Sequence, residues 1–217
     1  MPYTYRFPHP AVATDAIVFT VRDGRLEVLL IRRRNEPFQG MWAFPGGYLD
    51  LDEDLQACAE RELAEETGIR GVTLQQFHAA GKPDRDPRER NISILHMGLV
   101  RPDQLRPVAG DDASAVAWFP ARRPPALAFD HRELLALARR HLNLRLQTSA
   151  AALRFLPPRF TLPALQAVYE AVAGRRLAPV AFRRQARTMD YLVPTGETAA
   201  GRHGRQRLYR AAGRGTP

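Results

Sequence analysis

Apolar residues recur along the chain in short runs of strand length. These runs lie at 16–19, 26–31, 72–77, 92–100 and 115–119. The first two are separated by Asp23-Gly24, a dipeptide typical of the tight turn of a β-hairpin. The spacing of apolar positions predicts a helix that ends at Gly68, and another over 131–141 with its N-cap near Asp130. Strands interleaved with helices predict one α/β domain over residues 1–150.

The pattern changes after a helical connector and the Pro-rich stretch 155–159, which indicates a domain boundary. Beyond it, four apolar residues follow the i, i+3, i+4, i+7 spacing of a helix face: Leu165, Val168, Tyr169 and Val172. Thr161 is placed to cap this helix and Gly174 to end it. We therefore expect a second, smaller domain over residues 151–217.

A second helix of this domain is expected from Pro179. Its Phe182, Ala186 and Met189 lie within about 60° of one another, whereas three arginines cluster roughly 150° away. A strand, a flexible loop over 196–204 and a second strand follow, so the order predicts a winged helix-turn-helix that binds DNA. The DNA-binding candidates are Arg183, Arg184 and Arg187 on the helix, with Arg202, Arg205 and Arg207 on the wing. The alternative is a dimerisation module with a solvated basic face.

Charge supports the DNA interpretation. Of the 32 basic and 23 acidic residues, 12 and 3 lie in residues 151–217, so this region carries the whole formal net charge of +9. Lys82 is the only lysine, which indicates a codon bias toward arginine, but such a bias does not remove acidic residues. A local excess of basic charge is typical of a protein with a polyanionic partner, normally duplex DNA.

Composition narrows the class of protein. The hydrophobic fraction of 45% and the charged fraction of 25% are ordinary for globular proteins. No apolar run reaches the length of a membrane span or of a signal peptide core, so we expect a cytoplasmic protein with no membrane partner. A single cysteine, Cys58, excludes an internal disulfide and is expected to pack as a small residue.

Three carboxylates share one face of the first helix. Glu62, Glu65 and Glu66 lie within an arc of roughly 100°, and such a face repels itself unless a cation binds it. Oxygen ligands suit Mg²⁺ or Mn²⁺, which also hold phosphate oxygens. A solvated acidic face is the alternative, but Glu66 falls inside the apolar arc of the helix, where a metal or a neighbouring arginine must compensate its charge. The Gly46-Gly47 pair lets the backbone approach an ion or a phosphate.

This motif resembles the Nudix box. The residues at its fixed positions are Gly47, Glu53, Arg61, Glu62, Leu63, Glu65, Glu66, Gly68 and Ile69. The preceding residues 44–47 are similar to its usual lead-in. The resemblance implies an α/β/α sandwich with a mixed sheet. It also implies that a loop-helix-loop holds divalent metal while a water attacks the diphosphate of a nucleoside diphosphate linked to another group.

The same resemblance implies a role for each matching residue. Glu65 and Glu66 correspond to metal ligands, with the carbonyl of Gly46 as an addition. Glu62 corresponds to a further ligand or a base, Arg61 to its orienting partner, and Glu53 to a supporting residue. Asp111 or Asp112 is a weaker candidate for a late metal ligand.

With the winged helix included, nearly the whole chain resembles the Nudix-related transcriptional regulators of bacterial NAD metabolism, which sense ADP-ribose. The supporting local phrases lie at 35–42, 84–88, 128–131 and 182–184. Asp84 is a candidate to line the ligand pocket, together with Gly46, Gly47, Arg85, Arg88 and His131. Relatives commonly have a smaller turn at 88–93, so the ligand stays open between ADP-ribose and a related nucleoside diphosphate sugar.

Two functions follow from these features. The first is a homodimeric transcriptional regulator that binds duplex DNA, controls genes of NAD-related or sugar metabolism, and binds ADP-ribose with Mg²⁺ or Mn²⁺. Its intact box also predicts hydrolysis of ADP-ribose to AMP and ribose 5-phosphate. The alternative is a Mg²⁺-dependent ADP-ribose pyrophosphatase without a specific DNA target.

Overall fold

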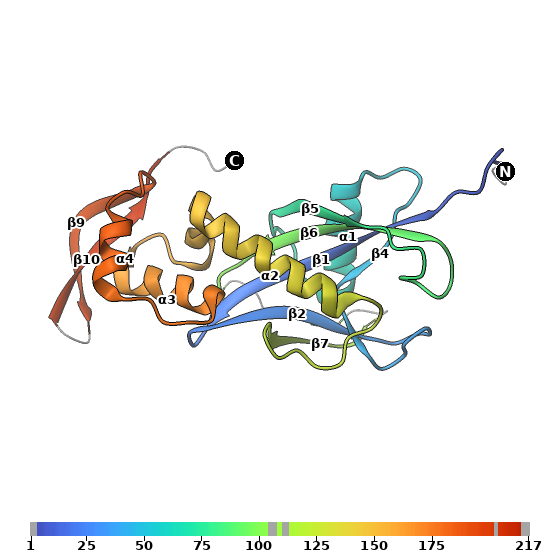
Figure 1. Cartoon of the computed structure of the whole chain (residues 1–217), viewed down its shortest axis with the longest axis horizontal. Coiled ribbons are helices and arrows are strands. Elements are labelled where there is room, and N and C mark those ends of the chain that lie inside the picture. Colours follow the sequence, from blue (N-terminus) through green and yellow to red (C-terminus); the bar gives the residue numbers. More distant parts are fainter. Residues whose placement is uncertain (1–3, 104–107, 110–112, 202–203, 214–217) are drawn as a thin grey trace.

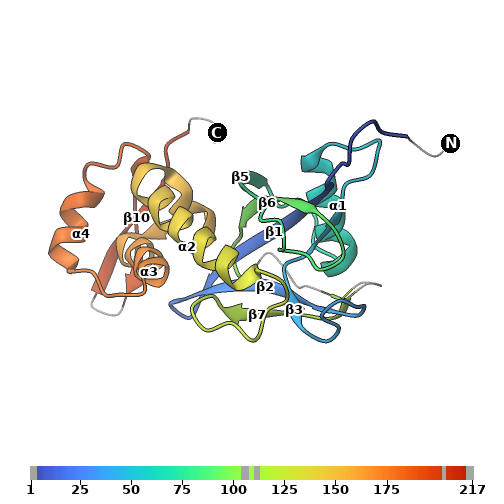
Figure 2. The same cartoon turned by 45° about the vertical axis from the view of Figure 1, so that its right-hand side comes forward.

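The computed structural model describes residues 4–103, 108–109, 113–201 and 204–213. A sheet covered by helices lies at one end of the molecule, and a helix-turn-helix with a β-hairpin lies at the other (Figure 1). A long helix, α2, lies over the sheet and reaches the second part, as the rotated view also shows (Figure 2). The predicted α/β/α sandwich followed by a winged helix is confirmed. No described helix is long and apolar enough to cross a membrane.

The sheet has seven strands: β1 (Ala11–Arg22), β2 (Arg25–Arg33), β3 (Trp42–Ala43), β4 (Gly46–Tyr48), β5 (Leu74–Ala80), β6 (Asn91–Leu99) and β7 (Ala113–Pro120). Its main path runs β3-β2-β1-β6-β5, with β4 paired to β1 and β7 paired to β2. Strands β1 and β6 are parallel and the other pairs are antiparallel, so the sheet is mixed as predicted. The β1-β2 turn takes positive φ at Asp23 and Gly24, as the sequence indicates.

Side chains of β1 alternate between the two faces of the sheet. Ala16 and Val18 pack in one cluster with Leu63 of α1 (Leu55–Thr67). Ile17 and Phe19 point the other way and belong to the cluster that contains the buried face of α2 (His131–Thr148). The two helices therefore cover opposite faces.

Helix α2 is longer than the prediction of 131–141. It continues to Thr148 because Leu142 and Leu146 keep its apolar face buried for two further turns. A 3₁₀ helix, η1 (Ala150–Phe155), then leads into the second part of the chain.

The winged helix contains β8 (Phe160–Thr161), α3 (Leu162–Ala173), α4 (Pro179–Ala186), β9 (Leu192–Gly201) and β10 (Gly204–Ala211). Thr161 caps α3 by accepting a hydrogen bond from Ala164 N (3.3 Å), and Gly174 ends it with φ 68°. The expectation of a flexible loop over 196–204 is wrong for most of that stretch. Strand β9 extends to Gly201, since residues 198–201 pair with β10.

The two parts of the chain share one hydrophobic cluster that includes α2, η1, α3 and α4. Within this cluster, the Tyr169 hydroxyl on α3 donates to the carbonyl of Leu146 near the end of α2 (2.7 Å). This carbonyl is one of the last four of the helix, which have no partner within the helix itself. The hydroxyl therefore ties the winged helix to the helix that covers the sheet.

Replacing Tyr169 with phenylalanine is expected to lower the free energy of unfolding by about 1 kcal/mol, because a buried carbonyl loses its hydrogen bond. The measurement is denaturant unfolding of both proteins. Tyr209→Phe is the matched control, since no hydrogen bond joins its hydroxyl to the described part of the chain. Equal stability of Tyr169→Phe and wild type would contradict the role assigned to this contact.

Candidate functional site

Helix α1 presents the acidic residues of the motif. It begins because the side chain of Asp54 accepts a hydrogen bond from Ala57 N (2.8 Å), and it ends at Gly68, which has φ 69°. Its Ala59 and Leu63 are buried against the sheet. This anchoring fixes which residues of α1 face the neighbouring Gly46-Gly47 segment.

The three carboxylates differ in their surroundings. Glu66 is 8% exposed, and its Oε2 accepts a hydrogen bond from Gly46 N (2.9 Å). Glu62 is half-buried, and burial raises the pKa of its carboxyl. Glu65 is exposed. A Cβ on Gly47 would lie 2.1 Å from Glu62 Oε1, so only glycine allows this close approach of β4 to α1.

Arg61 is the cation that lies among these carboxylates in the structure. Its Nη1 donates to Glu62 Oε1 (2.8 Å) and Glu65 Oε2 (3.2 Å), and its Nε donates to Glu53 Oε2 (3.0 Å). The guanidinium lowers the pKa of Glu53 to about 2, and Asp50 N also donates to this carboxylate (2.9 Å). Glu53, Arg61, Glu62 and Glu65 therefore form one connected group, as expected of an orienting arginine.

The donor set fits a hard divalent cation. Three carboxylates of α1 and the backbone of Gly46 offer only oxygen donors, and the glycine at position 47 leaves room that a side chain would fill. In the part of the chain that the structure describes, no group of three acidic, histidine or cysteine side chains is arranged to hold a metal ion. In this structure Arg61 forms ion pairs with both Glu62 and Glu65.

Six residues were predicted to line the ligand pocket, and five of them lie together at one cleft of about 120 Å³. They are Gly46, Gly47, Arg85, Arg88 and His131, and Glu66 lines the same cleft. Asp84 is exposed and does not line it. Asp111 and Asp112, like Arg202 on the wing, lie outside the described residues.

Arg85 holds the start of α2. Its side chain is 4% exposed and forms a two-point contact with Asp130, from Nε to Oδ2 (3.1 Å) and from Nη2 to Oδ1 (2.9 Å). Asp130 is the N-cap residue of α2, but its side chain makes no capping hydrogen bond. The carboxylate predicted as a helix cap instead links α2 to the cleft.

His131, the first residue of α2, is buried and neutral. Phe44 N donates to its Nδ1 (3.1 Å), and the two rings stack with centroids 4.6 Å apart. Because Nδ1 accepts this hydrogen bond, the ring proton lies on Nε2, which faces Asp15 Oδ1 at 3.7 Å. Burial also lowers the pKa of His131. The imidazole thus holds Phe44, which also lines the cleft, in place.

Sequence reasoning missed several lining residues, among them Asp15, Arg33 and Phe129. The guanidiniums of Arg33 and Arg88 lie over the ring of Phe129, at 4.9 and 5.7 Å from its centroid. Asp15 accepts a hydrogen bond from the Ser93 hydroxyl on the neighbouring strand. The sequence signal for Asp15 was an acidic residue directly before the apolar run 16–19. Arg33 and Phe129 are distant in the sequence, and only the folded structure brings them together.

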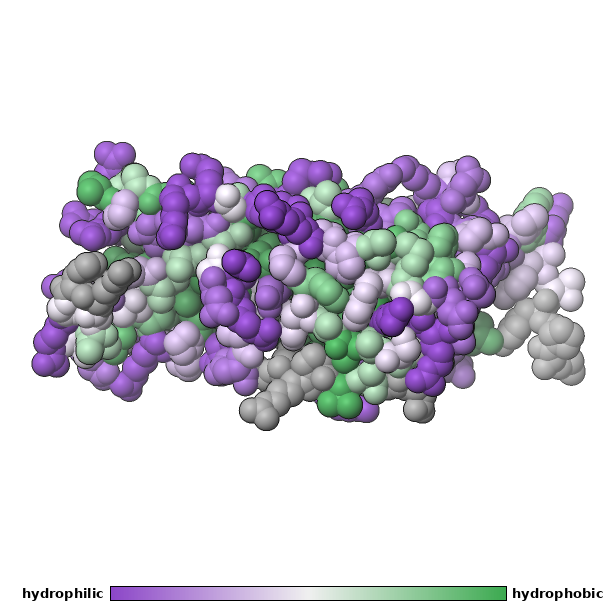
Figure 3. Space-filling model, turned by 90° about the horizontal axis from the view of Figure 1, so that it is seen from below, coloured by the Kyte–Doolittle hydropathy of each residue, from purple (hydrophilic) through white to green (hydrophobic). Residues whose placement is uncertain are grey.

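The basic residues predicted on the second helix of the winged helix are exposed. Arg183, Arg184 and Arg187 face outward, while Phe182 and Ala186 are 2% and 6% exposed. On the wing, Arg207 is exposed, and Arg205 Nε donates to the hydroxyl of Thr198 (2.8 Å). Hydrophilic side chains lie along the outer edge of the end of the molecule that carries the winged helix (Figure 3).

Residues 10–138 match the family described as NUDIX domain, and residues 152–211 match the family described as NrtR DNA-binding winged helix domain. The chain is 37% identical over 182 residues to the ADPR responsive transcriptional repressor NtrR of Acinetobacter baylyi, which covers 82% of this chain and 73% of the relative. It is 39% identical over 127 residues to an ADP-ribose pyrophosphatase of Methanocaldococcus jannaschii, which covers 58% of this chain and 72% of that protein.

Solved structures give the same pattern. The structure of Shewanella oneidensis NrtR complexed with a 27mer DNA matches with a TM-score of 0.77 at 32% identity over 93% of each chain. The NUDIX domain of the same protein complexed with ADP ribose matches with a TM-score of 0.57 at 34% identity, over 63% of this chain and 90% of that one.

Proposed function

Because this chain belongs to the NUDIX family and its residues 152–211 match the NrtR DNA-binding winged helix domain, we propose that it is a DNA-binding transcriptional repressor whose Nudix cleft binds ADP-ribose. The observation that carries the proposal is the path of α2, which starts at the cleft and ends against the winged helix. We assign residues 1–150 to the Nudix domain and 151–217 to the DNA-binding domain.

The cleft offers suitable groups for a nucleoside diphosphate sugar. Arg33 and Arg88 supply positive charge for phosphates, and Phe129 supplies a flat apolar surface. At about 120 Å³ the cleft is smaller than the roughly 300 Å³ and more that ligand pockets usually have. We propose that ADP-ribose displaces lining side chains when it binds. Phe129 is one of them and directly precedes Asp130, the N-cap residue of α2.

This arrangement gives the ligand a route to the DNA-binding part. Displacement of Phe129, whose ring centroid lies 5.4 Å from that of His131, or of Arg85, which pairs with Asp130, acts on the start of α2. Helix α2 holds the winged helix through Leu146 and the shared hydrophobic cluster. A ligand shifts DNA affinity only as far as it binds the two arrangements differently. We propose that ADP-ribose favours an arrangement of the winged helices in a homodimer that binds the operator less tightly.

We further propose that the chain hydrolyses its effector to AMP and ribose 5-phosphate. Glu65, Glu66, the carbonyl of Gly46 and Glu62 would hold Mg²⁺ or Mn²⁺, which when bound supplies charge neutralisation and an activated water. The complete Nudix box supports this. In the chain itself, Arg61 orients Glu62 and Glu53 holds Arg61, while Gly47 keeps the backbone close to Glu62.

For the DNA contact, we propose that Arg183, Arg184 and Arg187 enter the major groove and that Arg202, Arg205 and Arg207 contact the backbone from the wing. A symmetric dimer would read an inverted repeat with half-sites about one or two helical turns apart. The second candidate function is a Mg²⁺-dependent ADP-ribose pyrophosphatase whose basic end has no specific target. The intact box favours it, and equal affinity for specific and scrambled DNA would select it.

The ligand assignment is tested by calorimetric titration of ADP-ribose into the full chain with a metal chelator present, followed by product analysis with Mg²⁺. The proposal predicts saturable binding of ADP-ribose in the presence of the chelator, and formation of AMP once Mg²⁺ is added. If ADP-ribose binds but no AMP forms with Mg²⁺, the Nudix domain is a sensor without hydrolase activity. If ADP-ribose neither binds nor is hydrolysed, it is not the ligand of this cleft.

Asp130→Asn is expected to weaken the response of DNA binding to ADP-ribose, because its two-point contact with Arg85 joins the cleft to α2. The coupling free energy should fall by about 1 kcal/mol, while DNA affinity without ligand changes little. The measurement is the ratio of the DNA dissociation constants with and without ADP-ribose. Lys82→Gln is the matched control, since it breaks an exposed ion pair between the same two segments, Lys82 to Glu133. An unchanged ratio in Asp130→Asn would exclude this contact as the link.

A further inference from the structure

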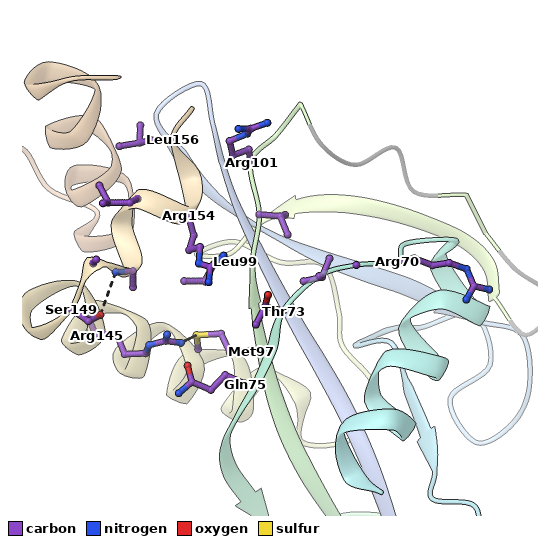
Figure 4. Close-up of a pocket in the computed structure, with 16 residues that line it drawn as sticks. Arg70, Thr73, Gln75, Met97, Leu99, Arg101, Arg145, Ser149, Arg154 and Leu156 are labelled. Carbon is purple, nitrogen blue, oxygen red and sulfur yellow. Dashed lines mark hydrogen bonds between the residues drawn. The ribbon is translucent and has the colours of Figure 1, made fainter. Parts of the chain in front are cut away.

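Two cavities lie beside α2, and both are lined by arginines. The first, of about 540 Å³, lies between the sheet and η1 (Figure 4). Two of its four arginines are directed elsewhere: Arg70 points toward α1 and away from the other side chains, and Arg101 pairs with Asp103 (3.1 Å). Arg145 contacts Met97 Sδ (4.0 Å), and the charge of Arg154 acts on it. This leaves two arginines, Arg145 and Arg154, as the positive charge of this cavity.

The second cavity, of about 710 Å³, concentrates charge more strongly. We call it the arginine groove, and its four arginines are Arg122, Arg139, Arg140 and Arg175. They come from the turn after β7, from α2 and from the turn between α3 and α4. None of the residues that line the groove is acidic. Glu170 of α3, the acid closest in sequence to Arg175, is occupied by Arg176 Nη1 (2.9 Å) and Leu177 N (2.9 Å).

The charges of the arginine groove lack partners within the described residues. Arg139 Nε is buried and has no hydrogen-bond partner there, and Arg140 and Arg175 form no ion pair. Burial and the charge of Arg122 lower the pKa of Arg139. Among the described residues, Arg122 donates to a single acceptor, the carbonyl of Val172 (3.0 Å). Guanidiniums held together without carboxylates favour the entry of an anion.

The arginine groove is separate from the proposed DNA surface. Gln185 lines the groove from α4. At about 100° per residue, it lies roughly 100° to 160° around the helix from Arg183, Arg184 and Arg187. DNA seated on those three arginines therefore leaves the groove open. The groove is also distinct from the Nudix cleft, since the two share no lining residue.

We propose that the arginine groove is a second ligand site that takes a small molecule with two or more linked phosphates, such as a nucleotide. The four guanidiniums bind the phosphates, and Tyr169, Val172 and Leu177 offer an apolar wall for the rest of the molecule. Its volume lies within the roughly 300 to 1,000 Å³ of small-molecule sites. A ligand there touches α2, α3 and α4 together.

The test is calorimetric titration of inorganic pyrophosphate, and separately of ADP, into the full chain with a metal chelator and saturating ADP-ribose present, so that the Nudix cleft is occupied. Wild type should show saturable binding at one site per chain. Arg139→Gln/Arg140→Gln should weaken it at least about tenfold, because two charged donors are lost. Arg140→Gln alone, which replaces an exposed side chain, should weaken it severalfold without affecting thermal unfolding.

Two controls place the binding event. Arg154→Gln, in the cavity of Figure 4, and Arg88→Gln, in the Nudix cleft, should each leave the affinity within about twofold of wild type. The absence of saturable binding in wild type would overturn the proposal. So would a loss of affinity in Arg154→Gln equal to that in Arg139→Gln/Arg140→Gln, or loss of binding in Arg88→Gln. Displacement of pyrophosphate by duplex DNA in wild type but not in Arg183→Ala/Arg187→Ala would also overturn it, by giving the groove to DNA.

Discussion

Glu66→Gln is expected to lower Mg²⁺-dependent hydrolysis of ADP-ribose at least about 10²-fold, because metal-bound water and charge neutralisation carry several kcal/mol of transition-state stabilisation. The fold should persist, since an amide oxygen can still accept the hydrogen bond from Gly46 N. The measurement is steady-state turnover by chromatography of AMP, together with thermal unfolding of each protein.

Glu60→Gln on the same helix is the matched control for this substitution. Glu60 is exposed and accepts a hydrogen bond from Gln56 Nε2, so the turnover of Glu60→Gln should equal that of wild type. Unchanged turnover in Glu66→Gln would remove this carboxylate from the reaction. A wild-type chain without turnover would restrict the Nudix domain to ligand binding.

Arg183→Ala/Arg187→Ala is expected to abolish the preference for specific over scrambled duplex. Arginines that read guanine edges contribute roughly 1 to 3 kcal/mol each, so the specific complex should weaken by at least about tenfold. Each lost phosphate contact should instead reduce the slope of log affinity against log salt by about 0.9. A salt-dependent binding titration against both duplexes separates the two contributions.

Arg25→Ala/Arg132→Ala removes the same charge from exposed positions of the Nudix part and serves as the control. It should lower both affinities slightly and equally. The same result in Arg183→Ala/Arg187→Ala would reduce the winged helix to a nonspecific basic surface and favour the hydrolase alternative.

Local sequence signals predicted most of the fold. Asp23-Gly24, Gly68, Thr161 and Gly174 each stand where the structure turns, caps or ends an element, because these residues act through their own backbone or nearest neighbours. The end of α2 was predicted too early. Its last turns are stabilised by tertiary burial of Leu142 and Leu146, which the local pattern does not reveal.

The candidate site was predictable where the motif is contiguous. Glu62, Glu65 and Glu66 follow from helix periodicity, and Arg85 and Arg88 lie in a phrase of a known family. The partners of these residues were not predictable. Asp130 was expected to cap α2 but pairs with Arg85, 45 residues away, and only the packed structure shows that contact.

The four arginines of the arginine groove come from three segments of the chain. Composition revealed an excess of arginine in the final residues, yet three of the four groove arginines, Arg122, Arg139 and Arg140, belong to the part of the sequence with balanced charge. The excess of positive charge arises where these residues meet in the folded structure, and not within any one stretch of the sequence. The amino-acid composition of a sequence segment could therefore not have revealed it.

The central claim is that one chain couples ADP-ribose in its Nudix cleft to DNA on its winged helix. The most direct test is the dissociation constant of the full chain for duplex from its own upstream region, measured with and without saturating ADP-ribose in the presence of a metal chelator at fixed salt. The account predicts at least about fivefold weaker DNA binding with ADP-ribose, and an equal loss of ADP-ribose affinity when duplex is bound. Identical dissociation constants with and without ADP-ribose would contradict it.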